Sequence, residues 1–286
     1  MKIIAGNIQG YKVNSSMTFM SGKIDYSTPF YVEDISGSPN SFGVIKHNDS
    51  APTLTIEKSL DKVNWEVMGT TSTTEITASI PANGRLYIRC KTNNWSNGVE
   101  WSTNKIQLSG RCNIGGNIMS LLYGDDFTGN ETSFPSVSEQ YIFDHLFHGQ
   151  NNIISVYGLQ FPVLTLGYYV YNSMFYGCRS LLIAPKILPA TNLGSRCYQQ
   201  MFMLCTSLIK TPDLIAATSM GDNPYYRMFR GCRSLNEVRC LTASINNEAR
   251  EWLYDVSSTG TFYKKIGATW PTGSDGIPEG WTVVEV

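Results

Sequence analysis

The hydrophobic positions between Phe143 and Leu241 recur at a fixed interval. In each copy a tyrosine is followed by Met-Phe, then by Cys, and then by Ser-Leu, as in residues 171–181, 198–208 and 225–235. Equivalent methionines stand two steps of 27 residues apart (201−174 and 228−201), at Met174, Met201 and Met228. A weaker copy precedes them at Phe143, Leu146 and Phe147, after one extra residue. A period in the twenties predicts a solenoid, in which each coil stacks on its neighbour.

Within a copy, the hydrophobic residues fall at i, i+3, i+4 and i+7, as at Tyr171, Met174, Phe175 and Cys178. These positions share one face of an α-helix, so the pattern predicts a short amphipathic helix of about two turns in each coil. The Ser-Leu pair then leads into a short extended run, and Pro185 or Pro212 prevents a helix from continuing. We therefore expect one helix and one short strand per coil, with the repeated hydrophobic residues in the core.

Alternating hydrophobic and polar residues characterise the region before the repeats. Residues 54–57, 65–67 and 86–90 have the period of two that is typical of half-buried strands, and turn-forming residues separate them. About seven such runs predict an antiparallel, immunoglobulin-like sandwich with Trp65 in its core.

The predicted fold class is therefore α+β and multidomain. Residues 1–27 form an N-terminal arm or docking segment, residues 28–114 the sandwich, residues 115–256 the solenoid and residues 257–286 a C-terminal cap. The arm is either an edge strand that packs on its neighbour or a segment that docks on a larger assembly.

The charge and the lengths of the apolar runs exclude some classes of partner. Charged residues make up 16% of the chain and the net charge is −1, without a run of Lys or Arg, so nucleic-acid binding is not expected. No apolar run has the length of a transmembrane helix, and the first residues become polar too early for a signal peptide. We expect no membrane insertion, and synthesis and retention in a cytoplasm or release outside the general secretory route.

The seven cysteines are odd in number and show no CxxC spacing, and three of them share one repeat position: Cys178, Cys205 and Cys232. We interpret these three as small apolar residues stacked in the core, with disulfides between coils as the alternative. A zinc site would need paired spacings that the sequence lacks.

Two tryptophans, Trp95 and Trp101, lie in a polar loop after the last predicted strands of the sandwich. Exposed tryptophans in loops stack on sugar rings or anchor protein partners, and the alternative is that they fold back over the sandwich. The residues between the repeated hydrophobic positions are the other candidates for contact with a partner or glycan. The main ones are Tyr176, Arg179, Arg230 and Arg233.

No catalytic motif is present. The three histidines, His47, His145 and His148, have no accompanying zinc-protease motif, and there is no nucleophile elbow or phosphate-binding loop. The pair Asp125-Asp126 lacks the order of a calcium loop and is interpreted as part of a turn. We predict that the protein is not an enzyme and has no catalytic residues, no cofactor and no metal site.

The Met-Phe-x-x-Cys-x-Ser-Leu sequence at 174–181 and 201–208 resembles the BspA-like leucine-rich repeats. The C-terminal run with Gly260-Thr261-Phe262-Tyr263 resembles a degenerate last repeat of this group, and residues 54–122 are similar to the β module that often precedes it. Such repeats occur in surface proteins of gut and oral bacteria and in virion proteins of their phages. The resemblance implies adhesion or virion structure and transfers no catalytic residue.

Two functions follow as hypotheses. The first is a non-enzymatic bacteriophage virion protein, a fibre or decoration of head or tail, which docks on other virion proteins through its arm and presents the repeats to host glycan or protein. It is expected to be a homo-oligomer, with a trimer as the preferred state. The alternative is a bacterial cell-surface adhesin or glycan-binding protein. An enzyme acting on cell-wall sugars is the least favoured.

Overall fold

The computed structural model describes residues 25–92, 95–135, 140–214, 217–242, 245 and 248–286. Of the predicted arm over residues 1–27, residues 1–24 lie outside this described part. The described chain is mostly β, with one short α-helix, α1 (Ser120–Tyr123), and one 3-10 helix, η1 (Gly124–Asp126). The predicted α+β class is therefore corrected to a mostly β fold.

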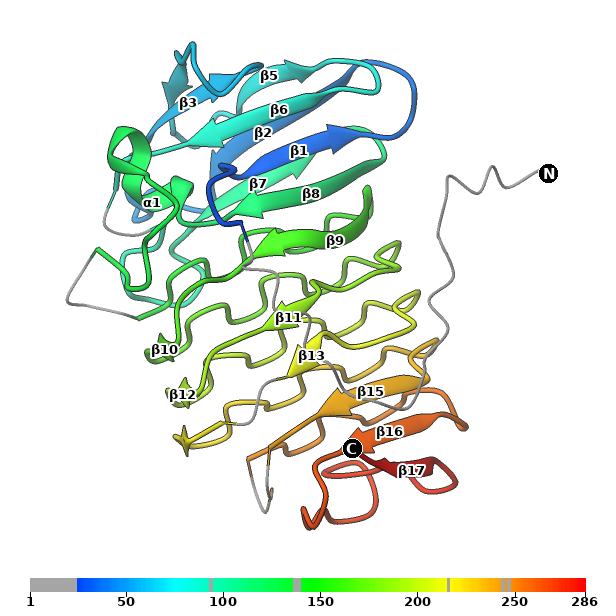
Figure 1. Ribbon diagram of the computed structural model, residues 1–286. Helices are drawn as coiled ribbons and strands as arrows, with labels where there is room; N and C mark the ends of the chain where they lie inside the picture. Colours follow the sequence, from blue (N-terminus) through cyan, green and yellow to red (C-terminus); the bar gives the residue numbers. More distant parts are fainter. Residues whose placement is uncertain (1–24, 93–94, 136–139, 215–216, 243–244, 246–247) are drawn as a thin grey trace.

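Two sheets make up the N-terminal part (Figure 1). The three-stranded sheet has the order β5-β2-β7 and is antiparallel, with the bounds Ile76–Ile80, Asn40–Lys46 and Asn104–Leu108. The six-stranded sheet has the order β4-β3-β6-β1-β8-β9, with the bounds Glu66–Thr70, Thr55–Ser59, Arg85–Arg89, Tyr31–Asp34, Cys112–Asn117 and Ile153–Gln160. The strands predicted over 54–57, 65–67 and 86–90 are confirmed as β3, β4 and β6.

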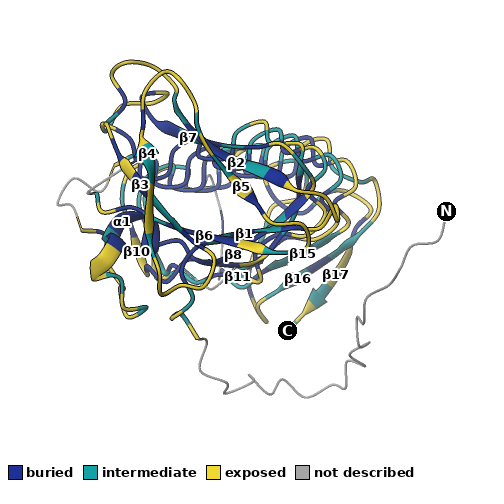
Figure 2. Cartoon of the chain, turned by 90° about the horizontal axis from the view of Figure 1, so that it is seen from above, coloured by how far each residue is buried: buried dark blue, intermediate teal, exposed yellow. Residues whose placement is uncertain are grey.

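Apolar side chains of both sheets share one core. Val32, Ile56 and Ile88 of the larger sheet and Phe42 and Val44 of the smaller one are fully buried in the same cluster. Figure 2 shows the two sheets facing each other, with buried residues along many of their strands and exposed residues mainly in the outer loops. Burial alternates along β1 and β7, as expected for strands with one buried face, whereas β6 and β8 have consecutive buried residues.

The larger sheet ends at β9, and an isolated bridge connects it to the strands of the repeats. β8 pairs with β9 in parallel, unlike the antiparallel pairs around β1, β3, β4 and β6. A bridge joins Ser155 of β9 to Ile183 of the next coil, and another joins Lys210 to Glu237. Because β8 spans residues 112–117, the predicted domain boundary between 114 and 115 falls inside a paired strand.

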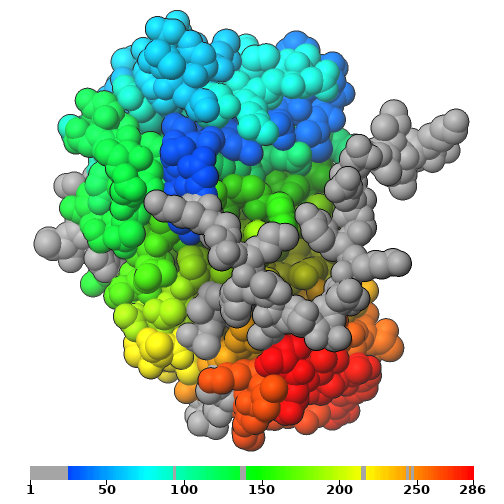
Figure 3. Space-filling view, viewed as in Figure 1, coloured from blue at the N-terminus to red at the C-terminus, as the bar shows by residue number. Residues whose placement is uncertain are grey.

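The repeats carry short parallel strands on two sides of the coils. One sheet has the order β10-β12-β14, with the bounds Thr165–Leu166, Asn192–Leu193 and Ser219–Met220. The other has the order β11-β13-β15-β16-β17, with the bounds Ile187–Leu188, Asp213–Leu214, Glu237–Cys240, Thr261–Lys264 and Thr282–Glu285. The coils follow one another in sequence order along the molecule (Figure 3).

The helix predicted in each coil is wrong. The segment around Met174 consists of consecutive turns, in which Tyr169, Tyr171 and Ser173 adopt positive φ. Successive backbone amides alternate between bonds within a coil and bonds to the next coil. Met174 N–H donates to the Tyr171 carbonyl of the same coil, whereas Phe175 N–H donates to the Met201 carbonyl of the next coil. Bonds between coils therefore take amides that an α-helix would use internally. We call the side formed by residues 141–150, 168–178, 195–205, 222–232 and 248–256 the turn face.

The repeated side chains do fill the core, as predicted. Rings at the phenylalanine position stack face to face, with centroid distances of 5.2 Å, 5.3 Å and 5.5 Å along Phe147, Phe175, Phe202 and Phe229. This spacing follows from the separation of about 4.8 Å between hydrogen-bonded parallel chains. The interpretation of the three repeat cysteines is confirmed: they are free and buried. Each thiol donates to a carbonyl of the preceding coil, at 3.0–3.1 Å.

Two further predictions are corrected. Trp65 is only half-buried: its indole N–H donates to the Lys62 carbonyl, and the Arg89 guanidinium lies over its ring. The fully buried tryptophan of the N-terminal part is instead Trp95. Phe262 is not the Met-Phe position of a degenerate repeat, because it lies in β16 opposite Val238. The last copy of the turn is instead centred on Trp252, whose carbonyl accepts from Phe229 N–H as the Met201 carbonyl accepts from Phe175.

Candidate functional site

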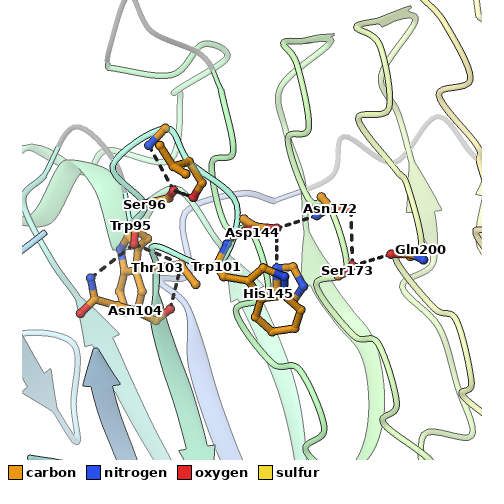
Figure 4. A network of polar contacts seen from close by, with 12 residues as sticks. Trp95, Ser96, Trp101, Thr103, Asn104, Asp144, His145, Asn172, Ser173 and Gln200 are labelled. Carbon is orange, nitrogen blue, oxygen red and sulfur yellow. Dashed lines mark hydrogen bonds and ion pairs between the residues drawn. The ribbon is translucent and has the colours of Figure 1, made fainter. Parts of the chain in front are cut away.

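Trp95 does not belong to a surface site. Its side chain is fully buried, and the indole N–H donates to the Leu121 carbonyl at 2.7 Å (Figure 4). The ring lies 6.4 Å from that of Phe143 in the first coil. Trp95 therefore joins the N-terminal sheets to the repeats, and we remove it from the residues that contact a partner.

Trp101, six residues further on, is 38% exposed and lies over the first coil. Its ring centroid is 3.7 Å from that of His145, 5.1 Å from that of His148 and 5.2 Å from that of His47. All three histidines of the chain therefore surround one tryptophan. We call Trp101, His47, His145, His148 and Lys105 the Trp101 patch.

The buried side chain of Asp144 connects the segments that form this patch through hydrogen bonds. It is fully buried, and its carboxylate accepts from the ring of His145 at 2.6 Å and from the side-chain amide of Asn172 at 2.8 Å (Figure 4). The second carboxylate oxygen accepts from the backbone N–H of Trp101 at 3.2 Å. Three donors from three segments thus fix the loop on the first coil, since a buried carboxylate needs such partners.

The backbone of Trp101 is itself unusual. Its φ is +64°, in the left-handed region that costs a residue with a side chain about 1 kcal/mol or more. The Asp144 carboxylate and the Asn48 side chain, which donates to the Trp101 carbonyl at 3.1 Å, bind both of its backbone polar groups. These bonds hold the indole in its exposed position.

Lys105 adds one cation to the patch. It lies in β7 beside β2, opposite Ile45, and its Nζ is 5.5 Å from the centroid of the Trp101 ring. Partial burial lowers the pKa of Lys105, and the charge of Asp144 acts against that shift. Within the described residues no ion pair joins Lys105 to a carboxylate.

Two histidines of the patch, His47 and His148, have lowered pKa values. Burial lowers the pKa of His148 to about 4 and also lowers that of His47, and the neighbouring cations act in the same direction. The charge of Asp144 acts against the shift at His47. At pH 7 the rings of His47 and His148 are therefore mostly neutral beside the positive charge of Lys105.

Tyr176 extends the patch onto the second coil. Its ring lies 4.9 Å from that of His148 in an edge-to-face contact, and its side chain is half-buried. The backbone equivalents of His148 and Tyr176 in later coils are Met203, Arg230 and Tyr254, each of whose carbonyls accepts from the coil before. This position varies in chemistry from coil to coil.

The predicted arginines do not join the Trp101 patch. Arg230 forms an ion pair with Glu251 and lies 4.8 Å above the ring of Tyr254, and Arg233 pairs with Asp255 at 3.0 Å. Arg179 is exposed on the second coil, and its backbone N–H donates to Asn151. The candidate residues therefore form two groups. Trp101, Tyr176 and Arg179 lie at the first two coils, and Arg230 and Arg233 lie near the last coils.

Sequence reasoning missed His47, Lys105 and Asp144 as parts of one surface. Lys105 lies in β7, His47 directly follows the neighbouring strand β2, and Asp144 comes from the first coil. Within the described residues no group of three or more His, Cys, Asp or Glu side chains is arranged to hold a metal ion. No helix in the described part has the length and apolar character that crossing a membrane requires.

Comparison of the chain with family models, with curated proteins and with solved structures finds no match.

Proposed function

We propose that the protein is a non-enzymatic structural protein of a bacteriophage virion, a fibre or decoration of the head or tail. It presents the repeat surface for attachment to the host cell or its glycans. The observation that carries this proposal is the Trp101 patch, an exposed tryptophan held rigidly on a stacked scaffold. A rigid aromatic side chain loses little entropy on binding and stacks well on sugars or protein.

The finer assignments of the fold belong to the same proposal. The two N-terminal sheets form an immunoglobulin-like module, and the coils form a leucine-rich-repeat-type solenoid of the BspA-like kind. The repeated Met, Phe and Cys side chains are all buried, so they stabilise the stack and leave the residues between them for recognition. The proposed functional units are residues 1–27, 28–114, 115–256 and 257–286, with the second and third units sharing strand β8.

The proposed partners are other virion proteins, bound through the N-terminal arm, and further copies of the same chain. A trimer is the preferred assembly, because several weak sites that bind together give an affinity far above that of one site. Localisation in the virion follows from this assignment.

A bacterial cell-surface adhesin is the alternative. The same patch serves both functions, since each requires an exposed recognition surface on a rigid support. The two differ in location, so location is what the test must measure.

The test is to label purified phage particles with an antibody against this chain and to image them, with mass spectrometry of the same particles. The proposal predicts stoichiometric amounts of the chain and labelling at a defined place on head or tail. Labelling of the bacterial envelope in uninfected cells would overturn it in favour of the adhesin. Turnover of a polysaccharide panel, lost on Asp125→Asn or Asp126→Asn, would instead favour an enzyme.

A further inference from the structure

Among the described residues, Lys105 of the Trp101 patch lacks the carboxylate partner that several other half-buried cations have. The half-buried side chains of Arg89, Arg227 and Lys264 each lie against a carboxylate, at 2.6 Å, 3.1 Å and 2.7 Å. Lys105 is half-buried as well, and its carboxylate neighbour Asp144 already accepts from His145, Asn172 and Trp101. A cation in partly desolvated surroundings gains most from an anionic acceptor, since charged hydrogen bonds are the strong ones.

The surface beside Lys105 suits a sugar ring. The indole of Trp101 is supported by the imidazole of His145 at 3.7 Å, so the ring is held in one position while part of it faces solvent. The C–H groups of a pyranose pack on such a ring, and the neutral imidazoles of His47 and His148 at its sides supply hydrogen-bonding nitrogens for hydroxyl groups.

From these two observations we infer that the Trp101 patch binds a carboxylated sugar, a uronic or a sialic acid. Its ring packs on Trp101, and its carboxylate accepts from the Nζ of Lys105. The inference builds on the proposed attachment function and names the class of glycan for it. One fixed cation matches one carboxylate, whereas a polyphosphate would need a cluster of cations.

The experiment is calorimetric titration of the full chain at pH 7 with two matched pairs of probes. One pair is trigalacturonic acid and its methyl ester, and the other is 3′-sialyllactose and lactose. At least one acid is expected to bind at least tenfold more tightly than its neutral partner, because the ester and lactose lack the charged acceptor.

Variants locate the effect. Lys105→Gln is expected to weaken binding of the acid about tenfold and to leave the neutral probe unchanged, and Lys105→Arg is expected to restore most of the affinity. Trp101→Ala is expected to abolish binding of both members of the pair. Lys186→Gln removes the same charge from an exposed lysine outside the candidate residues and is the matched control, with no expected effect. Unfolding curves of each variant show whether the fold is retained, and Trp101→Phe replaces Trp101→Ala if it is not.

Equal affinity for acid and neutral probe, no binding of any probe, or equal weakening by Lys186→Gln and Lys105→Gln would overturn the inference. The attachment function itself is judged separately by particle labelling. A labelled virion whose protein binds none of the acids refutes the sugar class alone, whereas binding of the acid by a protein of the bacterial envelope refutes the virion assignment alone.

Discussion

The two ends of the turn face place cations over aromatic rings in different electrostatic surroundings. At the first coil, Lys105 lies over Trp101 without an ion pair to a carboxylate among the described residues. At the last coils, Arg227 lies over Tyr226 and Arg230 over Tyr254, and Glu251 pairs with both arginines. The arginines at the last coils are therefore neutralised by a carboxylate of the same chain, whereas Lys105 at the first coil has no such ion pair among the described residues.

The comparison indicates that different residues of a repeat provide stability and recognition. The same backbone bonds connect Gly149 to Tyr176 and Gly231 to Tyr254, and the same stack of phenylalanines lies beneath both ends. The side chains on the turn face can therefore change without changing the coil. We interpret the last coils as internally neutralised and the first coil as available to a ligand.

The largest expected effect tests the shared scaffold. Phe202 stacks between Phe175 and Phe229 in the middle of the solenoid. Phe202→Ala should lower the free energy of unfolding by about 3–5 kcal/mol, because it leaves a cavity in a fully buried stack. Urea denaturation measures the loss. Ile209→Ala, at an exposed site of the same coil, is the control and should change it by less than about 0.5 kcal/mol. Similar losses for both variants would show that the stack is not what supports the two ends.

An intermediate effect is expected at the last coils. Glu251→Gln removes the carboxylate that pairs with Arg227 and Arg230, so it should make this end resemble the Trp101 patch. We expect a loss of stability of about 1 kcal/mol and a new, salt-sensitive binding of trigalacturonic acid near Tyr254. Denaturation and titration followed by NMR measure the two quantities. Glu279→Gln, at an exposed glutamate, is the control for the charge change. If Glu251→Gln gains no anion binding, neutralisation is not what distinguishes the ends.

The smallest effect is a pH dependence that belongs to the first coil alone, since all three histidines surround Trp101 there. The pKa of His148 is lowered to about 4 by burial, so the folded state favours its neutral form. Its contribution to stability is present above the ordinary pKa of about 6.5 and is lost as the pH falls from there toward 4.

We therefore expect the free energy of unfolding to fall between pH 6.5 and pH 5, and to fall less in His148→Gln. Denaturation at both pH values gives the slope, and the NMR signal of the His148 ring gives its pKa directly. Titration of that ring near pH 6.5 would contradict the burial that the structure assigns to it.

Part of this architecture could be predicted from the sequence. Residues repeated every 27 positions must meet in a stack, so the burial of Phe175, Phe202 and Cys205 followed from the period alone. The helix did not follow, because the i, i+3, i+4, i+7 pattern is also satisfied by consecutive turns whose alternate amides bond to the next coil. Periodicity records which side chains are buried and does not distinguish these two backbones.

The candidate site was only partly predictable. Trp101 and Tyr176 were identified as surface residues, whereas Trp95 in the same loop is buried, because its partner Leu121 lies 26 residues away. The contacts of His47 and Lys105 with Trp101 depend on long-range strand pairing and on the docking of the loop on the first coil. No local pattern in one sequence records such contacts.

The most direct test of the account follows the indole N–H signals of the six tryptophans during titration with trigalacturonic acid. The Trp101 signal, assigned by its absence in Trp101→Phe, should move in a saturable way, while that of buried Trp95 stays in place. The methyl ester should move the Trp101 signal less at the same concentration. A Trp101 signal that stays in place while another tryptophan moves would contradict the assignment of recognition to the first coil.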